Sequence, residues 1–162
     1  MKTYTVERTV QIAAPIQAVF AFHLDFKNLA LISPSWMKAE LLDEKGMGSE
    51  KMMKLRVTQY GVFTSTWVVK IDEYDPPMHL TDLVISGPLP YFRHSRSFHQ
   101  PSDGCTELTD KLEYALPFGF IGKIANKISV QRMMEQMFEH RHRMTKALLE
   151  EKYVFKSAPL TS

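Results

Sequence analysis

The sequence predicts an α+β fold in which a curved antiparallel sheet of about six or seven strands wraps around a long C-terminal helix. Three stretches support this prediction. Residues 3–12 alternate apolar and polar side chains, residues 37–116 repeat strand-like segments joined by short turns, and residues 120–153 change to a helical period. Strands with short connections run antiparallel and bury one face of their sheet. We therefore expect the helix to cover that buried face.

The start of the chain predicts one strand and two short helices. Residues 3–12 place Tyr4, Val6, Val10 and Ile12 on one face of a strand. Pro15 suits the first turn of a helix over residues 15–25. A second short helix is expected over residues 26–33, before Pro34, because the residue preceding a proline is pushed away from helical angles.

Further strands are expected between residues 37 and 116. They are separated by turn sequences, among them KGMGS at 45–49, DPPM at 75–78 and QPSDG at 100–104. Two adjacent prolines cannot serve a central strand, which supports a turn at DPPM. The predicted strands are 37–43, 50–59, 63–75, 79–86, 91–99 and 106–116.

The last predicted element is one amphipathic helix over residues 120–153. Its apolar stripe is expected to contain Ile121, Ile124, Ile128, Met134, Met137, Phe138, Arg141, Thr145 and Leu148. The residues expected to face away are Lys123, Asn126, Lys127, Glu135, Glu139 and His142. Arg141 could reach charged side chains inside the fold or extend to the rim of the core, and the rim is favoured. The whole chain is predicted to form a single domain over residues 1–152, with a flexible tail over residues 153–162.

Composition and charge exclude several classes of protein. Twenty Lys and Arg against eighteen Asp and Glu give a formal charge of +2, which is too even to suggest a nucleic-acid partner. No apolar stretch approaches the ~18 residues of a transmembrane helix, and no secretory signal is evident. Cys105, the single cysteine, cannot form an intrachain disulfide. We expect a cytoplasmic protein, and the sequence leaves its oligomeric state open.

Four segments resemble the START-like (SRPBCC) superfamily, and within it the polyketide cyclase/dehydrase-like branch. They are AAPIQAVFAFHLDFKNLALISP, LTDLVISGPLPYFRHSRSF, TELTDKLEYALPFG and FEHRHRMTKALL, so the resemblance spans residues 3–150. The matching positions are Asp82, Gly87, Pro88, His94, Phe98, Thr109, Asp110, Tyr114, Pro117, Phe118 and Gly119. Where the branch often has a second histidine, this chain has Arg96. The resemblance implies a helix-grip fold but not one activity, because the superfamily contains carriers, enzymes and interaction domains.

The hairpin over residues 91–116 places charged side chains on the face that the alternation assigns to the core. If its turn is centred near Ser102, His94 pairs with Asp110 and Arg96 lies diagonally beside it. The loop GPLP at 87–90 turns the preceding strand back and brings Asp82 near both. We therefore predict a partly buried cluster of Asp82, His94, Arg96 and Asp110 on the concave side of the sheet.

Two interpretations of this cluster stay open. Buried charge is costly unless it is paired, so the cluster could be a self-satisfied ion network that fixes strand register. Alternatively, it forms the polar end of a small-molecule cavity between sheet and helix. Candidate apolar lining residues are Phe63, Trp67, Tyr114, Met134, Met137 and Phe138, although residues of these types are more often plain core than ligand contacts.

Three functions follow from these interpretations. The favoured one is binding of a small hydrophobic or amphipathic molecule, with the cluster at its polar end. The second, implied by the resemblance, is a cyclase or dehydratase in which Asp110 or Asp82 is a base, His94 an acid or base, and Arg96 steadies an enolate oxygen. The third is a protein-interaction module that uses the exposed helix face.

We expect neither a cofactor nor a metal. His140 and His142, two positions apart on a helix, point in roughly opposite directions, and His94 and His99 lie on opposite strand faces. No motif for a redox cofactor or a phosphate loop is present in the sequence.

Overall fold

The computed structural model describes residues 1–117 and 124–157, and in this range seven strands form one antiparallel sheet. The order across the sheet is β1-β7-β6-β5-β4-β3-β2. The strands are β1 (Thr3–Ile12), β2 (Met37–Lys45), β3 (Met52–Gln59), β4 (Phe63–Asp75), β5 (His79–Ser86), β6 (Tyr91–Ser102) and β7 (Cys105–Ala115). The helices are α1 (Ile16–Leu24), η1 (Phe26–Asn28), α2 (Leu29–Ile32), η2 (Gly48–Glu50) and α3 (Ile124–Ser157).

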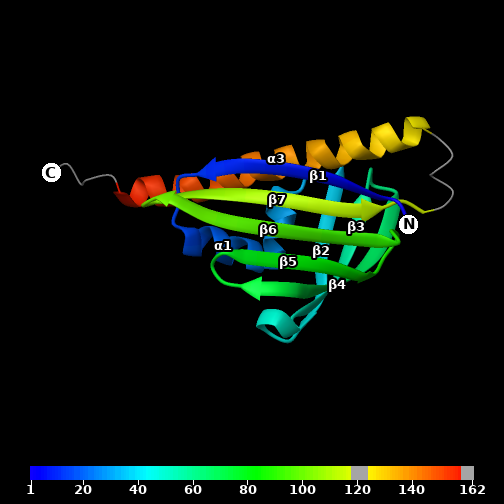
Figure 1. Cartoon of the computed structure of the whole chain (residues 1–162), viewed down its shortest axis with the longest axis horizontal. Helices are drawn as coiled ribbons and strands as arrows, with labels where there is room; N and C mark the ends of the chain where they lie inside the picture. Colours follow the sequence, from blue (N-terminus) through cyan, green and yellow to red (C-terminus); the bar gives the residue numbers. More distant parts are fainter. Residues whose placement is uncertain (118–123, 158–162) are drawn as a thin grey trace.

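The helices α1 and α3 lie on the same side of the curved sheet, which bends around α3 (Figure 1). The core between them has two parts. One joins α1 to the sheet through Phe20, Phe98 and Leu108, and the other joins α3 to β1 and β7 through Val6 and Met137. This is the predicted helix-grip arrangement. None of the helices in the part of the chain described here has an apolar stretch long enough to span a bilayer.

Most predicted boundaries are confirmed. The strands predicted over 3–12, 63–75 and 79–86 have those same bounds in β1, β4 and β5. The predicted second short helix is divided into η1 and α2, where the Asp25 carboxylate accepts a hydrogen bond from the Lys27 backbone N–H. Residues 153–157, expected in a flexible tail, instead continue α3. The predicted features in 118–123 and in 158–162 lie outside the described residues.

The predicted pairing of β6 with β7 is wrong by two residues. The turn lies at Asp103–Gly104, because Ser102 pairs with Cys105 and Gly104 has a φ of +69°. Two-residue hairpin turns require positive φ, which Asp-Gly sequences favour. An irregularity between His99 and Ser102 then shifts the register by one residue, so that Arg96 faces Asp110 and His94 faces Leu112. A shift of two residues keeps every side chain on its face, so the predicted cluster still lies on the concave side.

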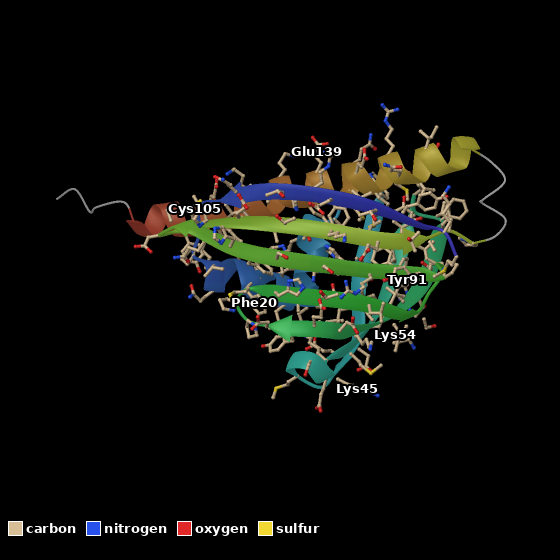
Figure 2. All side chains as sticks on the ribbon, viewed as in Figure 1. Phe20, Lys45, Lys54, Tyr91, Cys105 and Glu139 are labelled. Carbon is tan, nitrogen blue, oxygen red and sulfur yellow. The ribbon has the colours of Figure 1, made fainter. Side chains whose placement is uncertain are left out.

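Two positions on α3 differ from the predicted stripe. Ile128, expected in the core, is 61% exposed, whereas His142, expected to face away, is buried. His142 lies four residues after Phe138 and three before Thr145, and both of these are buried. That spacing places His142 on the buried face of the helix. Glu139, by contrast, projects from α3 away from the sheet as expected (Figure 2).

Candidate functional site

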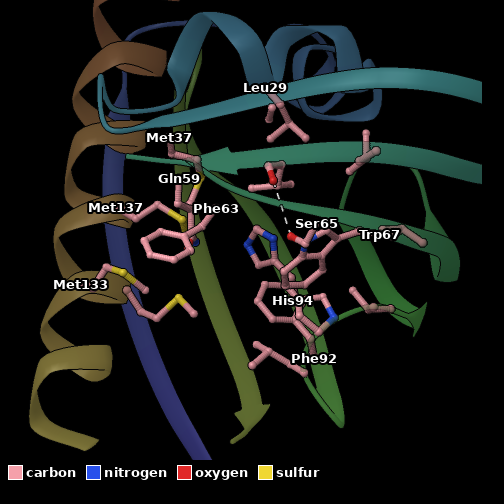
Figure 3. A pocket seen from close by; sticks show the side chains of 18 of the residues that line it. Leu29, Met37, Gln59, Phe63, Ser65, Trp67, Phe92, His94, Met133 and Met137 are labelled. Atoms are coloured by element: carbon pink, nitrogen blue, oxygen red, sulfur yellow. Dashed lines mark hydrogen bonds between the residues drawn. The ribbon is translucent and has the colours of Figure 1, made fainter. Parts of the chain in front are cut away.

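A cavity of about 620 Å³ lies between the sheet and α3. Trp67 and Phe92 from the strands face Met133 and Met137 of α3 across it, and His94 also points into it (Figure 3). The rings of Trp67 and Phe92 pack edge to face, with centroids 5.2 Å apart. Its wall is therefore mainly apolar, with aliphatic, aromatic and thioether side chains, as is typical of sites for apolar ligands.

A buried polar cluster adjoins this cavity. Arg96 Nη2 donates to Asp82 Oδ2 at 2.6 Å, and His94 Nε2 lies 2.5 Å from Asp110 Oδ1. The other oxygen of Asp110 lies 2.5 Å from Nε2 of His142. The strands β5, β6 and β7 thus each supply part of the cluster, and α3 closes it with His142. The four predicted residues Asp82, His94, Arg96 and Asp110 are together, as the alternation of side chains predicted.

The electrostatics of the cluster indicate a neutral His94 beside an ionised Asp110. Burial, followed by the charge of Arg96, lowers the pKa of His94. Burial opposes the charge of Asp110, but His94 and the hydrogen bond from His142 hold the pKa of that carboxyl well below its usual range. A neutral His94 then donates its Nε2–H to Asp110, which leaves Nδ1 as an acceptor 4.0 Å from Asp82 Oδ2.

Two histidines of this region were not predicted as site residues. His142 was missed because its place on the helix was assigned to the outer face. His23 of α1 hydrogen-bonds the Val19 carbonyl through Nδ1 at 2.8 Å, and burial lowers the pKa of His23 to about 4. Its ring lines a second cavity of about 20 Å³ that reaches Asp110 and Arg96. His23 lies four residues after Val19 and three after Phe20, so helical spacing puts all three on the buried face of α1. This spacing could have identified His23 as a site residue.

Arg141 lines the main cavity. The sequence had favoured a position at the rim of the core. The Arg141 Nε is buried without a hydrogen-bond partner among the described residues, and Nη2 lies 3.7 Å from Met37 Sδ. Burial and then repulsion from Arg96 lower the pKa of Arg141 to about 10. Three other buried atoms in the same region lack partners in the described part of the chain, namely Asp82 Oδ1, Arg96 Nη1 and Thr145 Oγ1.

The predicted apolar residues divide into two groups. Trp67, Met134 and Met137 line the main cavity, and so does Phe63, which is 70% exposed. Tyr114 is instead buried in the core against Tyr4, and Phe138 packs edge-on against the His94 ring. Neither is among the described residues that line the main cavity. Strand alternation gives the face of a side chain, but it does not tell whether a neighbour covers it.

No group of three or more His, Cys, Asp or Glu side chains within residues 1–117 and 124–157 is arranged to hold a metal ion. Asp110 and its two neighbours His94 and His142 illustrate why. Both oxygens of Asp110 accept hydrogen bonds from histidine Nε2 atoms, so the carboxylate and the rings satisfy one another.

Comparison with solved structures identifies the same fold. The Zhui aromatase/cyclase from Streptomyces sp. R1128 is 19% identical, with a TM-score of 0.67 and 99% of each chain covered. A START superfamily protein from Mycobacterium smegmatis is 14% identical, with a TM-score of 0.66, covering 91% of this chain and 98% of that one. The di-domain aromatase/cyclase StfQ of the steffimycin biosynthetic pathway is 13% identical, with a TM-score of 0.72, covering 93% of this chain and 51% of that one.

Sequence comparison gives the family. No curated protein sequence matches the chain. The family model described as polyketide cyclase/dehydrase and lipid transport matches residues 3–150, which is nearly the whole chain. The chain therefore belongs to the polyketide cyclase/dehydrase and lipid transport family.

Proposed function

We propose that this protein binds an apolar or amphipathic small molecule in the cavity between the sheet and α3. The observation that carries the proposal is a cavity of about 620 Å³ with an apolar wall and three buried polar side chains, Asp82, His94 and Arg96. Small-molecule sites commonly have about 300–1,000 Å³ and a few convergent polar groups in an apolar wall. The lipid-transport part of the family description supports the same class of ligand.

The α3 side of the wall suits ligands of varied shape. Met133, Met134 and Met137 all line the cavity from this helix. Methionine side chains are unbranched and polarisable, so they adapt to different apolar surfaces. The ligand's apolar part is proposed to lie between these methionines and Trp67, with its polar end toward Arg96.

The test combines purification and a blocking variant. Protein purified from its own host and examined by native mass spectrometry is expected to carry a small molecule. The ligand-free protein is expected to bind the neutral dye N-phenyl-1-naphthylamine and to melt at a higher temperature with it. Val57→Trp, which fills the cavity from β3, should abolish both effects.

The neighbouring Thr58→Trp is the matched control. Thr58 is not among the described residues that line the cavity, and alternation along β3 turns its side chain away from that of Val57, so this variant should bind like the wild type. Equal binding by both variants, or no binding by the wild type, would contradict the proposal. In the latter case, a protein partner recovered in pull-downs would favour an interaction module.

A second candidate function is supported by the His94–Asp110 hydrogen bond. A histidine that lines a cavity and is oriented by a buried carboxylate is suited to acid–base catalysis of the cyclase or dehydratase kind. For a substrate found by native mass spectrometry, His94→Ala and Asp110→Asn separate the two functions. Under catalysis a turnover rate collapses while affinity largely survives, whereas under binding alone only affinity changes.

A further inference from the structure

Arg141 is a charged cavity residue for which the described residues supply no acidic partner. No carboxylate oxygen in that part of the chain lies within 4.0 Å of its guanidinium. Its Nε is buried and unpaired, and its Nη2 reaches the sulfur of Met37, which is a weak acceptor. Arg141 is partly exposed, but burying a cation's Nε–H without an acceptor is costly.

Each carboxylate nearby already accepts a hydrogen bond from another side chain. Asp110 accepts hydrogen bonds from His94 and His142, one on each oxygen. Asp82 accepts from Arg96 at 2.6 Å. Arg96 itself, only 4% exposed, still has a buried Nη1 without a partner in the described residues.

Arg96 and Arg141 therefore both bring unpaired N–H donors to one cavity. The two side chains line both the large cavity and the small one beside it. Burial and then repulsion from Arg96 lower the pKa of Arg141, although Asp110 and Asp82 act in the opposite direction, so these carboxylates do not fully compensate the two cations. An oxyanion between them would accept from both guanidiniums and offset that repulsion.

We propose that the ligand of this cavity is an amphipathic carboxylic acid whose carboxylate is held by Arg96 Nη1 and Arg141 Nε. This inference rests on the proposed function and names the chemical class of its ligand. The apolar part of the acid lies against Trp67, Phe92 and Met137, and the carboxylate faces the polar cluster. A singly charged head suits the site better than a phosphate dianion, because Asp82 Oδ1 is also unpaired and would repel a second negative charge.

Three probes of equal chain length test the head group. Dodecanoate, dodecan-1-ol and methyl dodecanoate would each compete with N-phenyl-1-naphthylamine for delipidated protein at neutral pH. The wild type is expected to bind dodecanoate about tenfold or more tightly than the alcohol and the ester, since hydrogen bonds to charged groups are worth about 1.5–3 kcal/mol. Arg141→Gln should bring dodecanoate to within about twofold of the two neutral probes, all three measured on the same variant.

Arg143→Gln is the matched control, because it removes the same charge from an exposed position on the same helix. It should keep the preference for the acid. Arg141→Gln is expected to melt no lower than the wild type without ligand, because it removes an unpaired buried charge. A large loss of stability with the acid preference intact would instead assign Arg141 a structural role and overturn the inference.

The failures of the two proposals can be told apart. If all three probes bind the wild type equally well, the carboxylate inference fails and the binding function stands. If neither the probes nor the dye binds, while Val57→Trp behaves like the wild type, the binding function itself fails.

Discussion

The two faces of the sheet carry the same side-chain types with opposite consequences. On the concave face, Arg96 pairs with Asp82 at 2.6 Å beside His94. On the convex face, Arg93 pairs with Glu73 at 3.0 Å, and Glu73 also lies 2.9 Å from His79. We call these groups the inner cluster (Asp82, His94, Arg96 and Asp110) and the outer cluster (Glu73, His79 and Arg93). Arg93 and His94 are neighbours on β6, so one step along the strand separates them.

Exposure is what distinguishes the clusters. The side chains of Asp82 and Arg96 are 7% and 5% exposed, whereas those of Glu73 and Arg93 are 48% and 23% exposed. Water can solvate each member of the outer cluster alone, but an inner charge depends on its partner. The same chemistry therefore forms a candidate site only where the sheet and α3 exclude water.

The largest expected difference comes from removing one carboxylate on each face. Asp82→Ala should lower the free energy of unfolding by about 3–5 kcal/mol, because Arg96 is left buried with only the longer contact of its Nε to Asp110 Oδ1 at 3.8 Å. Glu73→Ala should cost at most about 1 kcal/mol, as expected for an exposed ion pair. Urea unfolding monitored by tryptophan fluorescence measures both. Losses of similar size would show that the inner cluster is solvated in solution.

A smaller effect is the dependence of the free energy of unfolding on pH, which arises from His23. The pKa of His23 falls from 6.5 to about 4 on folding, so between these values the unfolded chain binds a proton that the folded chain does not. Stability from this group is complete above pH 6.5 and is lost as the pH falls toward 4. We expect a loss of about 1–3 kcal/mol over this interval, measured by urea unfolding at several pH values.

Variants at two histidines isolate this contribution. In His23→Asn the amide nitrogen can still donate to the Val19 carbonyl, and the loss of stability with acid should become shallower. Some loss should remain, because the pKa of His94 is lowered in the same direction. His99→Asn, which removes an exposed imidazole from β6, controls for the substitution. An unchanged acid dependence in His23→Asn would contradict the expectation.

The sequence was sufficient for the fold and for the face of the inner cluster. Strand alternation depends on the period of two, so Asp82, His94 and Arg96 were placed correctly even though the hairpin pairing was wrong by two residues. Asp103–Gly104 is the stronger turn signal, but a turn there alone would set Arg96 opposite Lys111. The observed pairing with Asp110 also requires the irregularity between His99 and Ser102.

The sequence could not predict which side chains on the buried face border the cavity and which are covered by neighbours. Arg141 was assigned to the correct helix face, but whether its guanidinium reaches the cavity depends on how α3 lies against β2 and α1. Tyr114 and Trp67 both belong to the concave side, yet only Trp67 borders the cavity, because Tyr4 and α3 cover Tyr114. Such differences arise from packing between elements distant in the chain, which periodicity does not encode.

The smallest predicted effect is the coupling within the outer cluster. A double-mutant cycle with Glu73→Gln and Arg93→Gln isolates this pair, although Arg93 also lies 3.5 Å from Asp72 and 3.7 Å from Glu113. We expect a coupling free energy of about 0.2–1 kcal/mol at low salt. It should approach zero near 1 M salt, where the Debye length falls to about 3 Å.

The same cycle on the inner pair, with Asp82→Asn and Arg96→Gln, should give a larger coupling that changes little with salt, because ions do not enter the buried cluster. If the single variants are too unstable, the salt dependence of wild-type and Asp82→Asn unfolding gives the comparison. A salt-insensitive outer pair would mean that its charges are shielded from water despite their exposure. Burial would then no longer explain why the inner and outer clusters differ in stability, and strand geometry would have to explain the difference.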